Sequence, residues 1–134
     1  MNFKKDLEFG QQYEKLFCEI MGFTDYKIST GKFKEYDIIN DNIKYEVKCD
    51  RLAAKTGNVA FEYECFKKPS GITTTQAHYY VYFILNGHDY DLFVIPVNDI
   101  KEYIKNNSQK YKNVSGGDFS KSKMYLIKRN EFTE

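Results

Sequence analysis

Residues 36–48 carry the strongest structural signal in the chain, and they read Tyr36-Asp37-Ile38-Ile39-Asn40-Asp41-Asn42-Ile43-Lys44-Tyr45-Glu46-Val47-Lys48. Two β-type runs, 36–39 and 43–49, flank Asn and Asp residues that tolerate the left-handed backbone of a tight turn. The pattern therefore predicts a β-hairpin. Because side chains alternate along a strand, Glu46 and Lys48 share one face of the second strand.

The length of the hairpin loop determines where Asp37 lies. We expect a two-residue loop to place Asp37 diagonally across from Glu46, and a four-residue loop to place it directly opposite. In either case the two carboxylates would be roughly 5 to 8 Å apart. A three-residue loop would turn Asp37 to the other face. Two carboxylates on one face repel each other unless one is neutralised or a cation lies between them.

These carboxylates suggest a cation site. Together with the Val47 carbonyl, Asp37 and Glu46 form a set of hard oxygen donors that suits Mg²⁺, and Lys48 points at the same place. The alternative is purely structural: Asp37 would pair with Lys44, and Glu46 with Lys48. The tripeptide itself carries no weight, because an acidic residue two positions before a lysine occurs three times in the chain, as expected by chance.

Periodicity and turn signals predict the elements around the hairpin. In chain order they are an amphipathic helix over about 4–21 ending at Gly22, an extended segment at 23–29, a turn at 30–32, the hairpin, a loop at 50–58, a strand at 59–66, a break at 67–71, a short helix within 73–78, strands at 79–85 and 89–96 joined by 86–88, a helix from 98 or 99 to about 105, a polar loop at 106–117, and an edge strand at 123–128. This order predicts an α+β or mixed α/β sheet in a single domain spanning residues 1–134.

Composition narrows the function. The 134 residues include 42% hydrophobic and 17% aromatic residues, which predicts a folded core. The net charge of +1 argues against a histone-like nucleic-acid binder, although a local basic face is allowed. Three widely spaced cysteines favour reduced thiols and do not favour zinc. With no apolar run long enough to cross a membrane, we expect a soluble cytoplasmic protein without a membrane partner.

Glu14 lies within the apolar stripe of the first predicted helix, which includes Gly10, Phe17 and Met21. A carboxylate facing a sheet needs a polar partner. A cation cluster at the hairpin would supply one, with Gly10 allowing close approach of the helix. Alternatively, Glu14 flanks the stripe and reaches solvent or a lysine.

The order of these residues resembles the PD-(D/E)XK nuclease superfamily. The shared pattern is Glu14 in a helix four residues after Gly10, Asp37 at one strand and Glu46-Val47-Lys48 on the next, and the Gly10 to Glu14 segment is similar to the first helix of Holliday-junction-resolvase-like members. The resemblance covers about residues 7–85. It departs from the family at Tyr36, which replaces the proline, and in the short interval from Asp37 to Glu46.

The resemblance implies a restriction-endonuclease-like fold, a mixed central sheet flanked by helices with core order αβββαβ. It also implies an endonuclease that uses Mg²⁺, with Mn²⁺ as a substitute, to hydrolyse phosphodiester bonds of DNA, including structured or branched DNA. Asp37, Glu46 and the Val47 carbonyl would hold the metal, and Glu14 would bind it through water or help position a second ion. Lys48 would orient the attacking water, because neighbouring carboxylates oppose the lowered pKa that a general base needs.

Residues after the predicted 59–66 strand are candidates for substrate binding, because lysines and hydroxyls before a helix N-terminus suit a phosphate. They are Lys67, Lys68, Ser70, Thr74 and Gln76. Plain helix capping is the alternative. Glu62 and Glu64 share a strand face and could extend the metal site, but an exposed polar face is the simpler interpretation.

Two other interpretations of the whole chain remain. One is a catalytically silent nuclease-fold domain that binds nucleic acid or a protein partner, and the other is an unrelated α+β binding module. If both DNA strands are cut, we expect a two-fold homodimer, since so small a domain covers little duplex.

Overall fold

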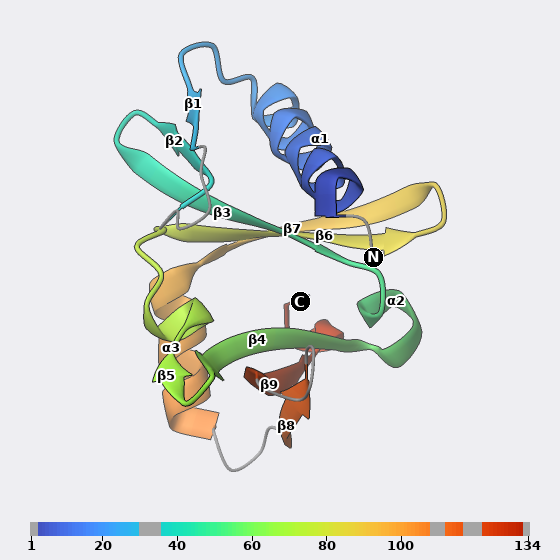
Figure 1. Cartoon of the computed structure of the whole chain (residues 1–134), viewed down its shortest axis with the longest axis vertical. Coiled ribbons are helices and arrows are strands. Elements are labelled where there is room, and N and C mark those ends of the chain that lie inside the picture. The colour runs from blue at the N-terminus through green and yellow to red at the C-terminus, as the bar shows by residue number, and fades with distance from the viewer. Residues whose placement is uncertain (1–2, 30–35, 108–111, 117–121, 133–134) are drawn as a thin grey trace.

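The computed structural model describes residues 3–29, 36–107, 112–116 and 122–132 of the chain. Within them it contains two β-sheets, a long N-terminal helix and a helix late in the chain (Figure 1). The elements are α1 Phe3–Met21, β1 Lys27–Ile28, β2 Ile38–Asn40, β3 Ile43–Asp50, α2 Ala53–Thr56, β4 Asn58–Cys65, β5 Lys68–Pro69, the 3-10 helix η1 Gly71–Thr73, β6 Tyr79–Asn86, β7 Asp89–Pro96, α3 Val97–Asn107, β8 Lys112–Gly116, β9 Ser122–Lys128 and the 3-10 helix η3 Arg129–Phe132.

The first sheet has the order β1-β2-β3-β6-β7 and is mixed: β3 and β6 are parallel, and the other neighbours are antiparallel. The second sheet, β5-β4-β9-β8, is antiparallel throughout. The prediction of a mixed α+β protein is therefore confirmed. Helix α1 covers one face of this sheet, whereas α3 and the second sheet lie on the other (Figure 1).

The two faces of β6 show how the layers are held together. Tyr80, Tyr82 and Ile84 belong to the core between the two sheets, where they meet Phe61 of β4. Residues at alternating positions of β6 face the other way, into the core that includes Phe17 of α1. A strand buried on both faces needs a nearly continuous apolar sequence, as the 79–85 run has.

The hairpin forms as predicted, with a two-residue loop. Asp41 and Asn42 have φ of 50° and 63°, the left-handed values that such a loop requires. The register pairs Ile38 with Tyr45. The ladder ends at this pair, and the backbone N–H of Asp37 donates to the Tyr45 carbonyl at 2.9 Å, so Asp37 remains beside β3 without continuing the regular register.

Several predicted elements differ from the structure. The predicted helix within 73–78 is absent: η1 ends at Thr73, and the Thr75 hydroxyl instead accepts a hydrogen bond from Ala77 N–H at 3.1 Å. The predicted loop at 50–58 contains α2, with Asp50 Oδ1 accepting from the backbone N–H groups of Leu52 and Ala53 at its start.

The remaining differences concern the second sheet. The predicted break at 67–71 contains β5, and the predicted polar loop at 106–117 contains β8. Because β8 pairs with β9, the latter is an inner strand and not the predicted edge. The predicted extended segment at 23–29 forms a strand only at Lys27–Ile28, and the predicted turn at 30–32 lies outside the described residues. No described helix is long and apolar enough to span a membrane.

Candidate active site

The candidate site lies where β3 continues past the end of β2. The pairing of β2 with β3 stops at Ile38 and Tyr45, whereas β3 runs on to Asp50. Asp37 stays beside β3 there, because its N–H donates to the Tyr45 carbonyl at 2.9 Å and its Oδ2 accepts from Val47 N–H at 2.7 Å. The Asp37 carboxylate thus accepts the hydrogen bond from Val47 N–H that a backbone carbonyl would accept if β2 were longer.

This hydrogen bond also indicates where the Val47 carbonyl points. The N–H and C=O of one strand residue point to the same side, and Val47 N–H faces Asp37. The Val47 carbonyl therefore lies on the same edge of β3 as the Asp37 carboxylate. Backbone geometry brings together two of the three oxygen donors expected for a cation.

Glu46 has polar contacts on both of its carboxylate oxygens. Its Oε2 lies 2.9 Å from Lys48 Nζ, and its Oε1 accepts a hydrogen bond of 3.0 Å from the Thr75 hydroxyl. The Glu46 side chain is 16% exposed and that of Lys48 is 46% exposed. One half of the structural alternative, the Glu46–Lys48 pair, is thus present, while the Lys44 ammonium lies over the Tyr36 ring, 5.2 Å from its centre.

Lys48 keeps its proton at neutral pH. Burial alone lowers the pKa of Lys48, but the nearby carboxylates of Glu46, Asp37 and Glu62 together raise it above its ordinary value. An ammonium with a raised pKa cannot serve as a general base near neutrality. It can orient water and interact with a negatively charged group.

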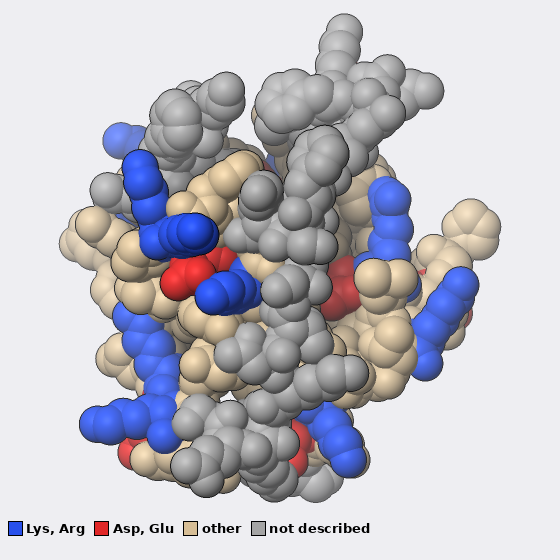
Figure 2. Space-filling view, turned by 60° about the horizontal axis from the view of Figure 1, so that its bottom comes forward, with Lys and Arg blue, Asp and Glu red and all other residues tan. Residues whose placement is uncertain are grey.

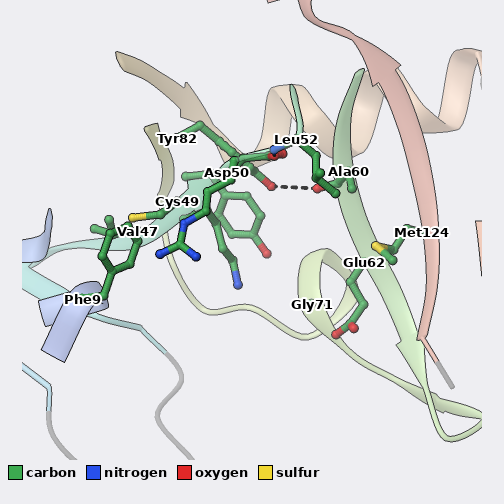
Figure 3. A pocket seen from close by; sticks show the side chains of 14 residues that line it. Phe9, Val47, Cys49, Asp50, Leu52, Ala60, Glu62, Gly71, Tyr82 and Met124 are labelled. Atoms are coloured by element: carbon green, nitrogen blue, oxygen red, sulfur yellow. Dashed lines mark hydrogen bonds between the residues drawn. The ribbon is translucent and has the colours of Figure 1, made fainter. Parts of the chain in front are cut away.

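An open cavity of 610 Å³ adjoins Lys48 and separates it from the second sheet. Figure 3 shows Glu62 of β4 on the far side of this cavity from Val47 and Phe9. Ser70 donates a hydrogen bond of 3.1 Å to Glu62 Oε2. Glu62 is half-buried and lines the wall of this cavity.

Tyr80 lies deepest in the site and was not singled out from the sequence. It neighbours Glu46 in the β3–β6 register and is 2% exposed. Burial and the charge of Glu46 raise its pKa, so the phenol stays neutral. Its hydroxyl makes no hydrogen bond within the part of the chain that the structure describes, although Glu46 and Thr75 are close by.

Glu14 is buried on α1, with 5% of its surface exposed. It is close enough to Cys49 that its charge contributes to that thiol's raised pKa, after burial, which is the largest cause; the pKa of Cys49 reaches about 11 in spite of Arg51. A thiol with a raised pKa stays protonated near neutral pH and is a poor nucleophile.

The donor set fits a hard cation. Among the described residues, no three His, Cys, Asp or Glu side chains lie close enough together to hold a metal ion. The oxygen donors that the resemblance implies, Asp37, Glu46 and the Val47 carbonyl, include only two such side chains. Mg²⁺ suits such a set, because it binds oxygen and keeps several waters, whereas zinc takes nitrogen and sulfur ligands.

The predicted substrate-binding residues spread along the segment after β4. Lys67 and Lys68 are exposed at the β4–β5 turn, and Ser70 is engaged with Glu62. Thr74 and Gln76 are exposed, and the neighbouring Thr75, not Thr74, contacts Glu46. The structure therefore brings Asp37, Glu46, Val47 and Lys48 together and leaves these residues around the site.

Charge on the molecular surface is mixed. In Figure 2, with the second-sheet end turned forward, acidic side chains lie among lysine and arginine side chains. Neither sign forms a continuous field on the part of this face that is described. This agrees with a net charge of +1 and means that contact with a polyanion would depend on a few individual lysines.

Comparisons with known proteins do not add to this picture. No protein-family model matches the chain, no curated protein matches it, and no solved structure matches it. The function must therefore be inferred from the site itself.

Proposed function

We propose that this protein is a metal-dependent nuclease that hydrolyses phosphodiester bonds of DNA. The observation that carries the proposal is the meeting of Asp37, Glu46, the Val47 carbonyl and Lys48 at one exposed strand edge. The resemblance to PD-(D/E)XK nucleases implies the same four groups in the same order. Hydrolysis of a phosphodiester needs oxygen ligands for a metal ion and a positive charge beside the phosphate, and hard oxygen donors next to an ammonium provide both.

Each residue has a distinct task in this proposal. Asp37, Glu46 and the Val47 carbonyl would hold Mg²⁺ or Mn²⁺. When bound, such a cation supplies positive charge beside the phosphate and lowers the pKa of water. Asp37 is already oriented by Val47 N–H, and Glu46 by the Thr75 hydroxyl.

Lys48 would orient the attacking water and contact a phosphate oxygen. It is charged at neutral pH and partly exposed, so it can reach substrate. Before substrate binds, Lys48 neutralises Glu46 across 2.9 Å. Glu14, on the α1 side of β3, would act through water or at a second ion, as the resemblance implies.

We also propose that the first sheet corresponds to the restriction-endonuclease-like core. Supporting this, α1 is followed by three strands, a crossover that begins with the short helix α2, and a strand parallel to β3. This chain departs from the expected αβββαβ order, because the crossover also contains β4, β5 and η1. A two-fold dimer remains the expectation if both strands of a duplex are cut.

One observation favours a second candidate, a catalytically silent domain of this fold that binds nucleic acid or a protein. Both oxygens of Glu46 already have partners within the protein, Lys48 and Thr75. If this arrangement is permanent, no cation binds there. The two candidates differ in a property that is easily measured, namely stabilisation by Mg²⁺.

The direct experiment incubates the protein with linear duplex, single-stranded, nicked and four-way-junction DNA, each with Mg²⁺, Mn²⁺ or EDTA. We expect cation-dependent cleavage that is lost in Asp37→Ala, Glu46→Ala and Lys48→Ala, each shown to be folded. Lys44→Ala is the matched control, because Lys44 lies on the same strand face but outside the site, and it should cleave like the wild type. Equal activity in all the variants would refute the assignment. Sedimentation with and without DNA tests the dimer.

A further inference from the structure

The turn between β4 and β5 has an unusual composition. It joins Cys65 to Lys68 through Phe66 and Lys67, whose φ values are 52° and 62°. Left-handed backbone is disfavoured for a bulky side chain, and turns of this kind normally use Asn, Asp or Gly. The chain follows that preference elsewhere: all other described residues with positive φ are Asp41, Asn42 or glycines.

Burial does not offset this strain. Phe66 is 67% exposed, which makes it one of the two most exposed large apolar side chains in the described structure. No described aromatic ring packs against it, and the adjacent Lys67 and Lys68 are exposed as well. A strained, exposed aromatic next to two lysines indicates a role outside the fold itself.

The turn is connected to the candidate site through Glu62. Phe66 follows Glu62 by four residues on the β4 hairpin, about 13 Å at 3.3 Å per residue. On the other side of the turn, Ser70 bonds to Glu62 and Thr75 bonds to Glu46. The hairpin thus continues from the site wall, and DNA held at the site would reach its tip within about four nucleotides at 3.4 Å each.

We propose that the β4–β5 turn is a wedge that inserts Phe66 between bases of the DNA bound at the site, while Lys67 and Lys68 contact phosphates beside it. This inference rests on the proposed function, because it names the form of DNA that the same site takes. Apolar side chains inserted into a base step unstack and kink DNA. Unstacking is easiest where pairing is already weakened, so the preferred substrate is DNA with a mismatch or similar defect.

The test measures binding in EDTA, so that no cleavage occurs. The probes are a duplex with one mismatch beside a 2-aminopurine base and its fully paired counterpart. We expect tighter binding and a larger rise in 2-aminopurine fluorescence with the mismatched duplex. Phe66→Asn should weaken binding to the mismatched duplex roughly fivefold or more and abolish the fluorescence change, since base–aromatic contacts are lost.

Three further variants separate the wedge from other effects. Phe66→Trp should retain discrimination, because it keeps an aromatic plane. Ile20→Ala, which removes another exposed apolar side chain but lies on α1, should bind like the wild type. Lys67→Ala should weaken binding to both duplexes equally and reduce the salt dependence by about 0.9 in log–log slope.

Stability gives an independent readout. Because Asn tolerates left-handed backbone better than Phe, Phe66→Asn should melt about 3 °C higher than the wild type while binding DNA less well. Unchanged discrimination in Phe66→Asn would overturn the wedge, and so would a wild type that binds both duplexes without a fluorescence change. Failure of the nuclease proposal looks different: discrimination that depends on Phe66 would persist, but no DNA would be cut with Mg²⁺ or Mn²⁺.

Discussion

Lys48 lies among carboxylates from three parts of the chain: Glu46 on its own strand, Asp37 before β2, and Glu62 on β4. These raise its pKa and make its role one of fixed positive charge. Lys48→Arg should therefore retain part of the cleavage activity, whereas Lys48→Met should lose about 100-fold or more. Cleavage rates of the wild type and Lys48→Arg between about pH 6 and 9 test this. The two pH profiles should have the same shape, because Lys48 does not ionise in that range. A general-base lysine would make Lys48→Arg as inactive as Lys48→Met.

The raised pKa of Lys48 also has a consequence for folding stability. A group whose pKa is higher in the folded state stabilises the fold fully below its unfolded pKa, about 10.4 for lysine. That stabilisation is lost as pH rises through the folded value. The charge of Lys48 therefore contributes throughout the neutral range.

Asp37 should report whether a cation binds. Without one, three carboxylates surround a single ammonium, so Asp37→Asn should raise the melting temperature in EDTA, while its side-chain oxygen can still accept from Val47 N–H. The wild type should be stabilised by Mg²⁺, by about 2.7 kcal/mol at 100 times the Kd, and Asp37→Asn should not. Melting curves with and without Mg²⁺ measure both effects.

Asp41→Asn is the control for this measurement. Asp41 is exposed in the hairpin loop, where Asn is equally suitable, so its substitution should change neither the melting temperature nor the response to Mg²⁺. A lower melting temperature for Asp37→Asn, together with a wild type indifferent to Mg²⁺, would favour the structural alternative and the silent domain.

At the scale of elements, η1 is fixed against β4 by a close approach that only glycine permits. A Cβ at Gly71 would lie 2.2 Å from the Glu62 carbonyl oxygen, and the residue has a φ of 54°. Gly71→Ala should therefore destabilise the protein by at least about 3 kcal/mol. Denaturant unfolding measures this.

Gly57→Ala is the matched control for the contact between η1 and β4. Gly57 ends α2 with a φ of 73°, but a Cβ there would meet open space. This substitution should cost only the backbone term of about 1–2 kcal/mol. Equal losses in the two variants would mean that the contact between η1 and β4 is unimportant.

The elements that could be predicted are those whose own residues specify them, without contacts from distant parts of the chain. The helix over about 4–21, the hairpin and the paired strands from Tyr79 to Pro96 all have periodicity or turn residues that do not depend on the rest of the fold. β8 lacks such a signal, because Lys112–Gly116 is polar and becomes a strand only beside β9. The sequence predicted a break at 67–71 but not the tight turn between β4 and β5, because Phe66 and Lys67 are not turn-forming residues.

The same distinction applies to the site. Asp37, Glu46 and Lys48 could be grouped from strand alternation alone, since one short hairpin carries them all. Thr75 could not, because its partner Glu46 is 29 residues away and the hydroxyls of Thr73 to Thr75 were expected to cap a short helix. Glu62 likewise reaches Lys48 only through the packing of the second sheet.

At the scale of the whole molecule, Tyr82 joins the two sheets directly. Its hydroxyl, on β6, donates a hydrogen bond of 3.1 Å to the Ala60 carbonyl on β4. Tyr82→Phe should cost about 1–2 kcal/mol, because the Ala60 carbonyl loses its partner. Tyr80→Phe should be within about 0.5 kcal/mol of the wild type or more stable, since the Tyr80 hydroxyl bonds to nothing among the described residues.

Urea unfolding of these two variants measures the difference. They remove the same atom from neighbouring buried positions of one strand, so the change in volume cancels in the comparison. If Tyr80→Phe proved as costly as Tyr82→Phe, the hydroxyl of Tyr80 would have to contribute through Glu46 or Thr75.

The two sheets alternate along the chain, and this topology affects how the protein folds. The chain passes from β3 in the first sheet to β4 and β5 in the second, returns through β6 and β7, and then goes back to β8 and β9. The pairing of β4 with β9 brings together residues such as Cys65 and Ser122, which are 57 positions apart. Closing such long loops makes folding slow. The first sheet needs β6 and β7, which follow β4 and β5 in the chain, and the second sheet needs β8 and β9, which follow β7. During synthesis, β4 must therefore wait for β9, with the apolar side chains that later form the core between the sheets still open to water.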